Sequence, residues 1–184
     1  MEKVKTTFVE LDYKEIAIYI TSLNVKQFQN VRPFELLIQL WGSSNDPIVQ
    51  KETAELNELI NFFNAISYWT ATEICTQPEV KMRQKVIERF IKIMRELKKL
   101  NNLNCLIAIL SGLNLSAVSR LKQTWEGIQP KYMNLYQEIE NFVSPEYNYK
   151  SYRAFLDELD HTKLEKVGCI PFYGINSADF RTLY

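Results

Sequence analysis

The sequence NLNCLIAILSGLNLSAVSRLKQTW, residues 102–125, decides the fold class. It contains no charged residue from Leu103 to Ser119. Its longest apolar run, residues 103–115, is too short to cross a bilayer and is interrupted by polar residues. Because a helix that is apolar on every side is buried on every side, we predict a central helix over residues 103–113. Its small and polar residues would allow close helix contact or lie at an end that reaches the surface.

Both flanks of this segment carry helical patterns. Apolar residues recur with a 3.6-residue period in residues 56–74 and 86–100 before it, and in residues 133–143 and 149–159 after it. Caps, prolines and glycines place the expected helix ends. We expect helices to begin at Asp12, Pro33, Asp46, Asn102, Ser116 and Pro130, and to end at Gly42 and Gly127. The helix that Ser116 would cap carries Val118, Leu121 and Trp125.

The rest of the chain adds no sheet. Residues 160–174 read as a loop and extended connector, and we find no alternating strand pair and no repeat of fixed period. The 184 residues, 46% of them hydrophobic, suffice for one ordinary core. We therefore predict one all-α domain over residues 1–184, built as an irregular multi-helix bundle.

Charge and cysteine usage restrict the partners and the compartment. The 22 basic and 22 acidic residues balance, so electrostatics do not favour nucleic acid or anionic lipid as a partner. We interpret Cys75, Cys105 and Cys169 as free thiols in a reducing compartment. Two of them lie in apolar runs, where we expect burial. The first residues lack the apolar core of a signal peptide. We expect a cytoplasmic protein, with any membrane recruitment left to flanking domains.

Motifs for covalent chemistry are missing from the sequence. The single histidine, His161, lies in the polar stretch DELDHTKLEK, which favours a solvated loop side chain over a catalytic base. The sequence has no HExxH zinc motif, no GxSxG nucleophile motif and no glycine-rich nucleotide loop. We predict no catalytic side chain, no metal site and no cofactor. This protein is expected to act by binding.

At residues 101–128, NNLNCLIAILSGLNLSAVSRLKQTWEGI closely resembles the signature of the Ras-type guanine-nucleotide exchange (RasGEF) domain, the catalytic module of Sos-like proteins. Further matches follow in the family's order over nearly the whole chain. They are EIAIYITSLNVKQFQNVRPFELLIQLW (15–41), FNAISYWTATEI (63–74), VIERFIKIMRELKKLNNLN (86–104), YNYKSYRAFL (147–156) and GCIPFYG (168–174). The resemblance implies an all-α fold, in agreement with the helical patterns.

The resemblance also implies a function and a partner. Such domains promote GDP release from Ras-like small GTPases of the Ras, Rap or Ral class by binding the switch II region and stabilising the nucleotide-free state. Carried over by motif, the expected GTPase-binding residues are Ile107, Ser111, Asn114, Tyr149 and Phe172. Four of them have a structural alternative: Asn114 as a helix cap, and Ile107, Tyr149 and Phe172 as core residues. Arg120 and Trp125 are expected to be structural, with the arginine stem against the ring.

The sequence departs from the family pattern after Gly174. The family continues into a helical hairpin that disturbs the magnesium and phosphate sites, whereas this sequence ends with INSADFRTLY. We therefore expect a domain that lacks most of the hairpin and the helices that support it. This leaves two alternatives: an exchange factor, or a truncated or pseudo-exchange domain that binds a GTPase, or acts as a helical scaffold, without catalysing exchange. We also predict self-association through apolar surface around residues 172–184.

Overall fold

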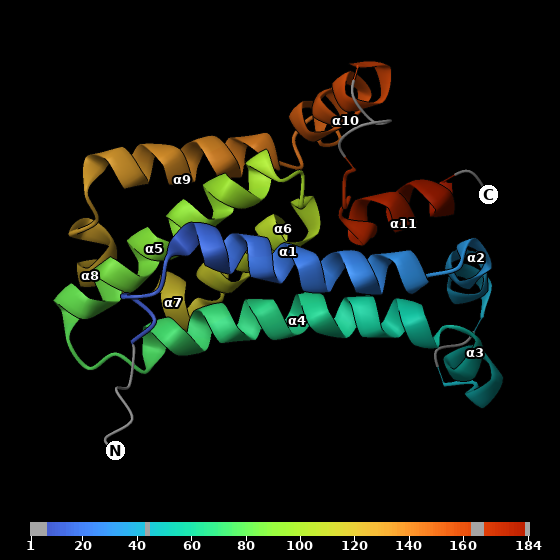
Figure 1. The fold of residues 1–184 in the computed structure, drawn as a ribbon, viewed down its shortest axis with the longest axis horizontal. Coiled ribbons are helices and arrows are strands. Elements are labelled where there is room, and N and C mark those ends of the chain that lie inside the picture. The colour runs from blue at the N-terminus through green and yellow to red at the C-terminus, as the bar shows by residue number, and fades with distance from the viewer. Residues whose placement is uncertain (1–6, 43–44, 163–167, 183–184) are drawn as a thin grey trace.

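The computed structural model describes residues 7–42, 45–162 and 168–182, which form helices joined by short connections (Figure 1). These residues contain no strand, only an isolated bridge between Asn102 and Ile170. The expected all-α class is confirmed. In chain order the helices are α1 Tyr13–Asn30, α2 Pro33–Trp41, α3 Pro47–Glu52, α4 Ala54–Cys75, α5 Val80–Lys99, α6 Leu103–Asn114, α7 Ser116–Ser119, α8 Lys122–Glu126, α9 Pro130–Phe142, α10 Lys150–Thr162 and α11 Tyr173–Thr182.

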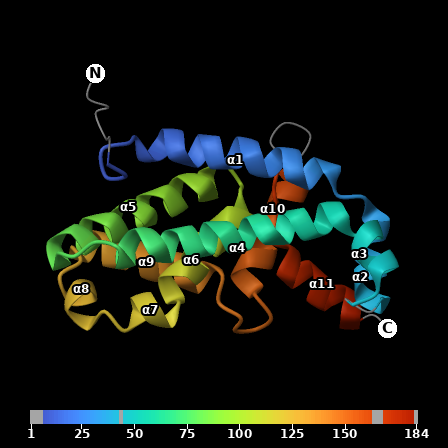
Figure 2. The same cartoon turned by 90° about the horizontal axis from the view of Figure 1, so that it is seen from below.

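Helix α6 is the centre of the bundle. The long helices α1 and α4 run side by side along one face, and α9 packs against α5 on another (Figures 1 and 2). Helix α6 contacts α1, α4, α5 and α7. Every residue from Leu103 to Leu110 is buried. The prediction of a central buried helix is therefore confirmed.

The small residues of α6 allow close contact with α4. A Cβ atom on Gly112 would lie 2.4 Å from the Ser67 carbonyl oxygen and 2.7 Å from Thr70 Cβ. Any side chain at this position would push the two helices apart, because main-chain atoms of α4 cannot turn away as a flexible side chain does. Gly112 thus fulfils one of the two roles predicted for the small residues of α6.

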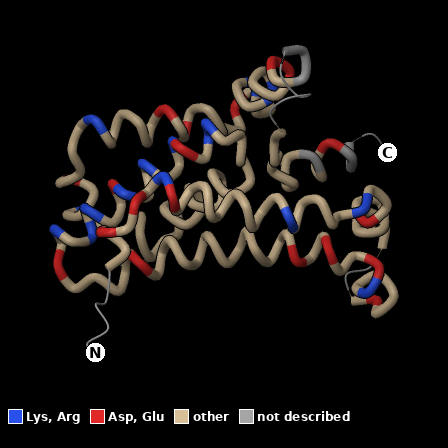
Figure 3. The backbone as a smooth tube through the Cα atoms, viewed as in Figure 1, with Lys and Arg blue, Asp and Glu red and all other residues tan. Residues whose placement is uncertain are grey.

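Helix α5 has an apolar inner face and a basic outer face. It carries eight Lys or Arg residues against two Glu, and Figure 3 shows these charged positions spread along the helix. None of the eight basic residues is buried. On the inner face the fully buried Phe90 ring lies 4.7 Å from the Phe8 ring and 5.0 Å from the Trp69 ring, measured between centroids. This aromatic cluster joins α4 and α5 to the segment before α1.

Most of the predicted helix ends are present. The Asp12 carboxylate accepts the Lys14 N–H at 2.7 Å, and the Asn102 side-chain oxygen accepts the Cys105 N–H at 3.0 Å. Both acceptors satisfy donors that a helix N-terminus leaves without an intrahelical partner. Proline begins α2, α3 and α9, and Gly42 and Gly127 follow the last residues of α2 and α8.

Two predicted helix boundaries are wrong. Ser116 is the first residue of α7 rather than its cap, and the helix expected to continue to Trp125 breaks near Leu121 into α7 and α8. No side-chain hydrogen bond caps either short helix. The expected connector over residues 160–174 is also shorter than predicted, because α10 continues to Thr162 and α11 begins at Tyr173. Residues 163–167 of that connector lie outside the described residues.

The cysteines differ from one another in burial. All are free, but only Cys105 is buried, while Cys169 is half-buried and Cys75 is exposed. Cys75 is exposed because it ends α4 at the surface. Of the patch expected to self-associate, residues 183 and 184 lie outside the described part. In the described part, none of the helices has the length and hydropathy needed to cross a membrane.

Candidate functional site

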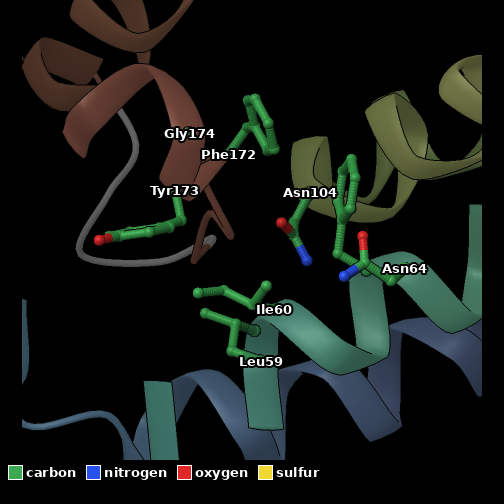
Figure 4. Close-up of a pocket in the computed structure, with 8 residues that line it drawn as sticks. Leu59, Ile60, Asn64, Asn104, Phe172, Tyr173 and Gly174 are labelled. Atoms are coloured by element: carbon green, nitrogen blue, oxygen red, sulfur yellow. The ribbon is translucent and has the colours of Figure 1, made fainter. Parts of the chain in front are cut away.

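An apolar pocket of about 240 Å³ opens between α4, α6 and the segment that leads into α11 (Figure 4). Its lining includes Leu59, Ile60, Phe63, Asn64, Asn104 and Phe172. The three apolar residues of α4 are spaced so that they share one face of that helix. The pocket is therefore lined mainly by apolar side chains, together with the exposed Asn64 and the buried Asn104.

The Phe172 ring forms one wall of this pocket. It stacks on the Phe63 ring, with centroids 5.1 Å apart and planes 28° apart. A Cβ atom on Gly174 would lie 2.5 Å from the tip of the Phe172 ring. Glycine at position 174 therefore lets the ring fold back over the start of α11 and reach α4.

The segment that carries Phe172 is fixed to the N-terminus of α6. The Ile170 carbonyl oxygen accepts the Leu103 N–H at 2.9 Å and the Asn104 N–H at 3.2 Å, and the Ile170 N–H donates to the Asn101 carbonyl at 2.9 Å. Asn101 has a φ of 54°, a left-handed conformation that asparagine tolerates better than most residues. The first N–H groups of a buried helix thus find their acceptor in a segment almost 70 residues later in the chain.

Two tyrosine hydroxyls hold the same segment from other sides. The fully buried Tyr152 hydroxyl accepts the Phe172 N–H at 2.8 Å, and the Tyr173 hydroxyl donates to the Gln39 side-chain oxygen at 2.6 Å. Burial raises the pKa of Tyr152 to about 12, so its phenol keeps its proton at neutral pH. Helices α10 and α2 therefore both position the Phe172 wall.

An ion pair joins α10 to α11 behind this segment. The Arg153 guanidinium makes a bidentate contact with the Asp179 carboxylate, at 2.6 and 2.8 Å. Its Nε donates to the Asn148 carbonyl at 2.8 Å, in a turn whose residues Tyr147, Asn148 and Tyr149 all have positive φ. The hydrogen bonds from Arg153 lower the pKa of the Asp179 carboxyl.

A second polar arrangement lies at the other end of α6. The hydroxyl oxygen of the buried Tyr136 lies 2.7 Å from Asn114 Oδ1 and 2.6 Å from Glu140 Oε1. The Trp125 ring packs against the Tyr136 ring at 5.2 Å, and Trp125 Nε1 donates to the Val118 carbonyl at 3.0 Å. Burial, and then the neighbouring Glu140 carboxylate, raise the pKa of Tyr136. Its phenol is therefore protonated at any physiological pH.

The predicted α6 residues share one face with the pocket. At 100° per residue, Asn104, Ile107, Ser111 and Asn114 fall within about 80° of one another around the helix axis and span about 15 Å along it. Ile107 is 9% exposed, Ser111 is partly exposed and Asn114 is exposed. The face thus runs from the pocket to an exposed amide.

The other predicted residues differ in where they lie relative to the pocket. Phe172 lines the pocket, but Tyr149 is half-buried at the start of α10 and is not among the pocket's lining residues. From the same NYKSY stretch, Tyr152 is the residue that contacts the Phe172 segment. Arg120 is exposed, and the ring that Trp125 contacts is that of Tyr136.

Sequence reasoning missed the α4 wall of the pocket. The periodic pattern of Leu59, Ile60 and Phe63 marks them as apolar and inward-facing, but nothing in it shows that they line an opening. The FNAISYWTATEI match begins at Phe63, so the family resemblance was the one signal that pointed to this part of α4.

Comparison with known proteins identifies the family of this chain. The RasGEF domain family model matches residues 15–183. The chain belongs to the RasGEF domain family. It is 36% identical over 169 residues to Ras guanine nucleotide exchange factor M of Dictyostelium discoideum, covering 92% of this chain and 17% of that protein. It is 31% identical over 179 residues to a Rap guanine nucleotide exchange factor of Caenorhabditis elegans, covering 97% of this chain and 12% of that protein.

This RasGEF domain spans a small part of its curated relatives. A third, Ras guanine nucleotide exchange factor I of Dictyostelium discoideum, is 38% identical over 170 residues, which cover 92% of this chain and 20% of the relative. In the described part of the chain, no group of three or more His, Cys, Asp or Glu residues lies close enough to hold a metal ion. The site consists of an apolar pocket at one end of α6 and a group of short hydrogen bonds at the other.

Proposed function

We propose that this chain acts in guanine-nucleotide exchange on a Ras-like small GTPase, by binding the switch II region and stabilising the nucleotide-free state. Membership in the RasGEF domain family supports the partner class, and the names of the relatives are those of Ras and Rap exchange factors. The Ras, Rap and Ral classes are all candidate partners.

The observation that carries the proposal is the single face formed by the pocket and α6. The pocket offers an apolar recess walled by Phe63 and Phe172, and the exposed Asn114 amide lies about 15 Å from Asn104 along the helix. An apolar recess with a few polar groups beside it is the arrangement that anchors buried side chains of a protein partner. We assign the recess to an apolar side chain of the GTPase, and Asn114 to a hydrogen bond with it.

Exchange by such a face needs no covalent chemistry. A GTPase that holds its nucleotide with picomolar affinity keeps it with about 16 kcal/mol. A protein that binds the nucleotide-free GTPase better than the loaded form weakens nucleotide binding by the same factor, because the two affinities are thermodynamically linked. Each tenfold weakening requires about 1.4 kcal/mol of differential contact. The contacts of the pocket and of α6 would supply this difference.

The test is the release of a fluorescent GDP analogue from Ras, Rap and Ral proteins. We compare the wild-type chain with Phe172→Ala, which removes one wall of the recess. The control is Tyr19→Ala, which removes an aromatic ring that is 65% exposed on α1 and is not among the pocket's lining residues. We expect the wild type and the control to accelerate release from one of these GTPases, and Phe172→Ala to lose the effect.

Two other outcomes would change the assignment. Wild-type binding to the nucleotide-free GTPase without faster release would make this chain a pseudo-exchange domain, which was the alternative raised by the sequence. Absence of both binding and release on the whole panel would refute the proposal. Circular dichroism of each variant establishes that a loss of activity is not a loss of fold.

A further inference from the structure

The hydroxyl of Tyr136 lies between two oxygen atoms but has one proton. Its oxygen is 2.7 Å from Asn114 Oδ1 and 2.6 Å from Glu140 Oε1, both short hydrogen-bonding distances. Because the phenol is protonated and donates one hydrogen, it donates to one of these two acceptors. The remaining contact must then be satisfied in another way.

Electrostatics decide which acceptor receives the proton. A carboxylate is a stronger acceptor than a neutral amide oxygen, and the bond to it is shorter, as the 2.6 Å distance to Glu140 is. If the proton went to Asn114 instead, the phenol oxygen and the carboxylate would face each other at 2.6 Å with no hydrogen between them. Tyr136 is 8% exposed, so little water reaches it to relieve this repulsion.

The contact with Asn114 is then satisfied by turning its amide. A rotation of 180° about the Cβ–Cγ bond exchanges Oδ1 and Nδ2 with almost no change in shape. After the rotation, Nδ2 donates to the phenol oxygen, and the chain of donors runs from Asn114 to Tyr136 to Glu140. Each group in this chain makes a bond that its chemistry allows.

We propose that Glu140 and Tyr136 are positioning residues that orient the Asn114 amide so that its oxygen faces outward as an acceptor. The GTPase group that meets Asn114 would accordingly be a hydrogen-bond donor, such as a main-chain N–H or an Arg, Lys or hydroxyl side chain. The consequence for the GTPase rests on the proposed function, whereas the orientation of the amide is a property of this chain alone.

The orientation is tested first without a GTPase. NMR of the ¹⁵N-labelled chain follows the Asn114 side-chain NH₂ group, whose exchange with water should be slowed in the wild type because one of its protons is held by Tyr136. Tyr136→Phe should abolish the protection, whereas Tyr132→Phe, which removes a hydroxyl from the same helix, should leave it unchanged. An NH₂ group that exchanges equally fast in the wild type and in Tyr136→Phe would overturn the proposal.

The effect on exchange is tested by a double-mutant cycle. Tyr136→Phe should lower kcat/KM for GDP release by about tenfold, the size expected for one hydrogen bond that orients a contact. In an Asn114→Ala background the same change should alter the rate by less than about twofold, because the amide to be oriented is gone. Equal losses in both backgrounds would show that Tyr136 acts through the fold and would overturn the proposal.

Glu140→Gln supplies the second variant. An amide at position 140 can either accept or donate, so the Tyr136 hydroxyl is no longer required to donate to position 140. We expect a smaller loss of kcat/KM than for Tyr136→Phe, and a partial loss of the Asn114 NH₂ protection. Glu138→Gln, which removes the same charge from α9, is the control and should change neither. If the wild-type chain acts on no GTPase, the proposed function fails while the NMR comparison still decides the orientation of Asn114.

Discussion

The two ends of α6 are built in opposite ways. At the N-terminal end Asn102 caps the helix, the Ile170 carbonyl accepts two of its N–H groups, and every residue is buried. At the C-terminal end Ser111 is partly exposed and Asn114 is exposed, with its side chain held by Tyr136. The N-terminal, closed end uses its hydrogen bonds to fix the segment that carries Phe172. The C-terminal, open end carries the amide that we propose is oriented for a partner.

The same residue type serves both ends. Asn102 and Asn104 are buried, and their side chains bond to Thr21 and Asn24 of α1, while Asn114 reaches the surface. The role of an asparagine in an apolar run therefore does not follow from the residue type alone, because it depends on what surrounds that position in the fold. Four predictions separate the closed end from the open end, beginning with the largest effect on stability.

Leu106→Ala should cause the largest loss of stability. Leu106 is fully buried near the closed end, and replacing a buried leucine by alanine lowers the free energy of unfolding by about 2–5 kcal/mol. Urea denaturation followed by circular dichroism measures this change. Ile18→Ala, at a site that is 58% exposed on α1, is the control and should change the free energy by less than about 0.5 kcal/mol. Equal losses in the two variants would contradict the burial of α6.

Asn102→Ala should have an intermediate effect. It removes the cap that accepts the Cys105 N–H and the bond to Thr21, at a cost of about 1–2 kcal/mol in the free energy of unfolding. The amides of Leu103 and Asn104 should stay protected in hydrogen exchange, because the Ile170 carbonyl still accepts them. Asn134→Ala, at an exposed position on α9, serves as the control. Loss of protection at Leu103 would show that Asn102, and not Ile170, closes this end.

The fold was largely predictable because its signals are local. Helix periodicity and caps at Asp12 and Asn102 act within a few residues, and α6 is apolar on every side, so one short stretch indicated its burial. The breaks near Leu121 and at Thr53 carry no proline or glycine, and periodicity alone does not reveal them. The extension of α10 and the start of α11 were missed for a similar reason, since weakly patterned helices depend on tertiary contacts.

The candidate site was less predictable because its geometry joins distant segments. Its pocket needs α4, α6 and the segment around Phe172, and the bond from Phe172 N–H to Tyr152 crosses 20 residues. The resemblance named Asn114, Tyr149 and Phe172 as expected GTPase contacts, but it gave no sign that Tyr152 would hold the Phe172 segment from inside the chain. A motif identifies the segment that takes part in the site. Which side chain of that segment faces inward depends on the backbone conformation, and Tyr149 here has a positive φ.

Acid should weaken the ion pair between Arg153 of α10 and Asp179 of α11. Arg153 lowers the pKa of Asp179 in the folded chain, so this ion pair stabilises the fold above the unfolded pKa of about 4. The stabilisation is lost as the pH falls through the lower folded pKa. Because both groups are partly exposed, Asp179→Asn should lower the free energy of unfolding at pH 7 by only about 0.5–1 kcal/mol.

The pH dependence distinguishes this pair from general acid unfolding. The difference in stability between the wild type and Asp179→Asn, measured by urea denaturation, should shrink between pH 5 and the acid limit of folding, about where an aspartate titrates. Glu146→Gln, at an exposed position before α10, is the control and should show no such difference. A difference that stays constant with pH would mean that Asp179 acts through its shape and not its charge.

Asn114→Ala should have the smallest effect on stability and a large one on function. Its side chain is exposed and Tyr136 keeps its bond to Glu140, so the free energy of unfolding should change by less than about 0.5 kcal/mol. If Asn114 is an anchor for the GTPase, the loss of at least about 2 kcal/mol of contact reduces GDP release by roughly thirtyfold. Gln137→Ala, exposed on α9, should leave both quantities unchanged. A variant that loses stability and activity in parallel would make Asn114 part of the closed core, and the contrast between the ends of α6 would then be wrong.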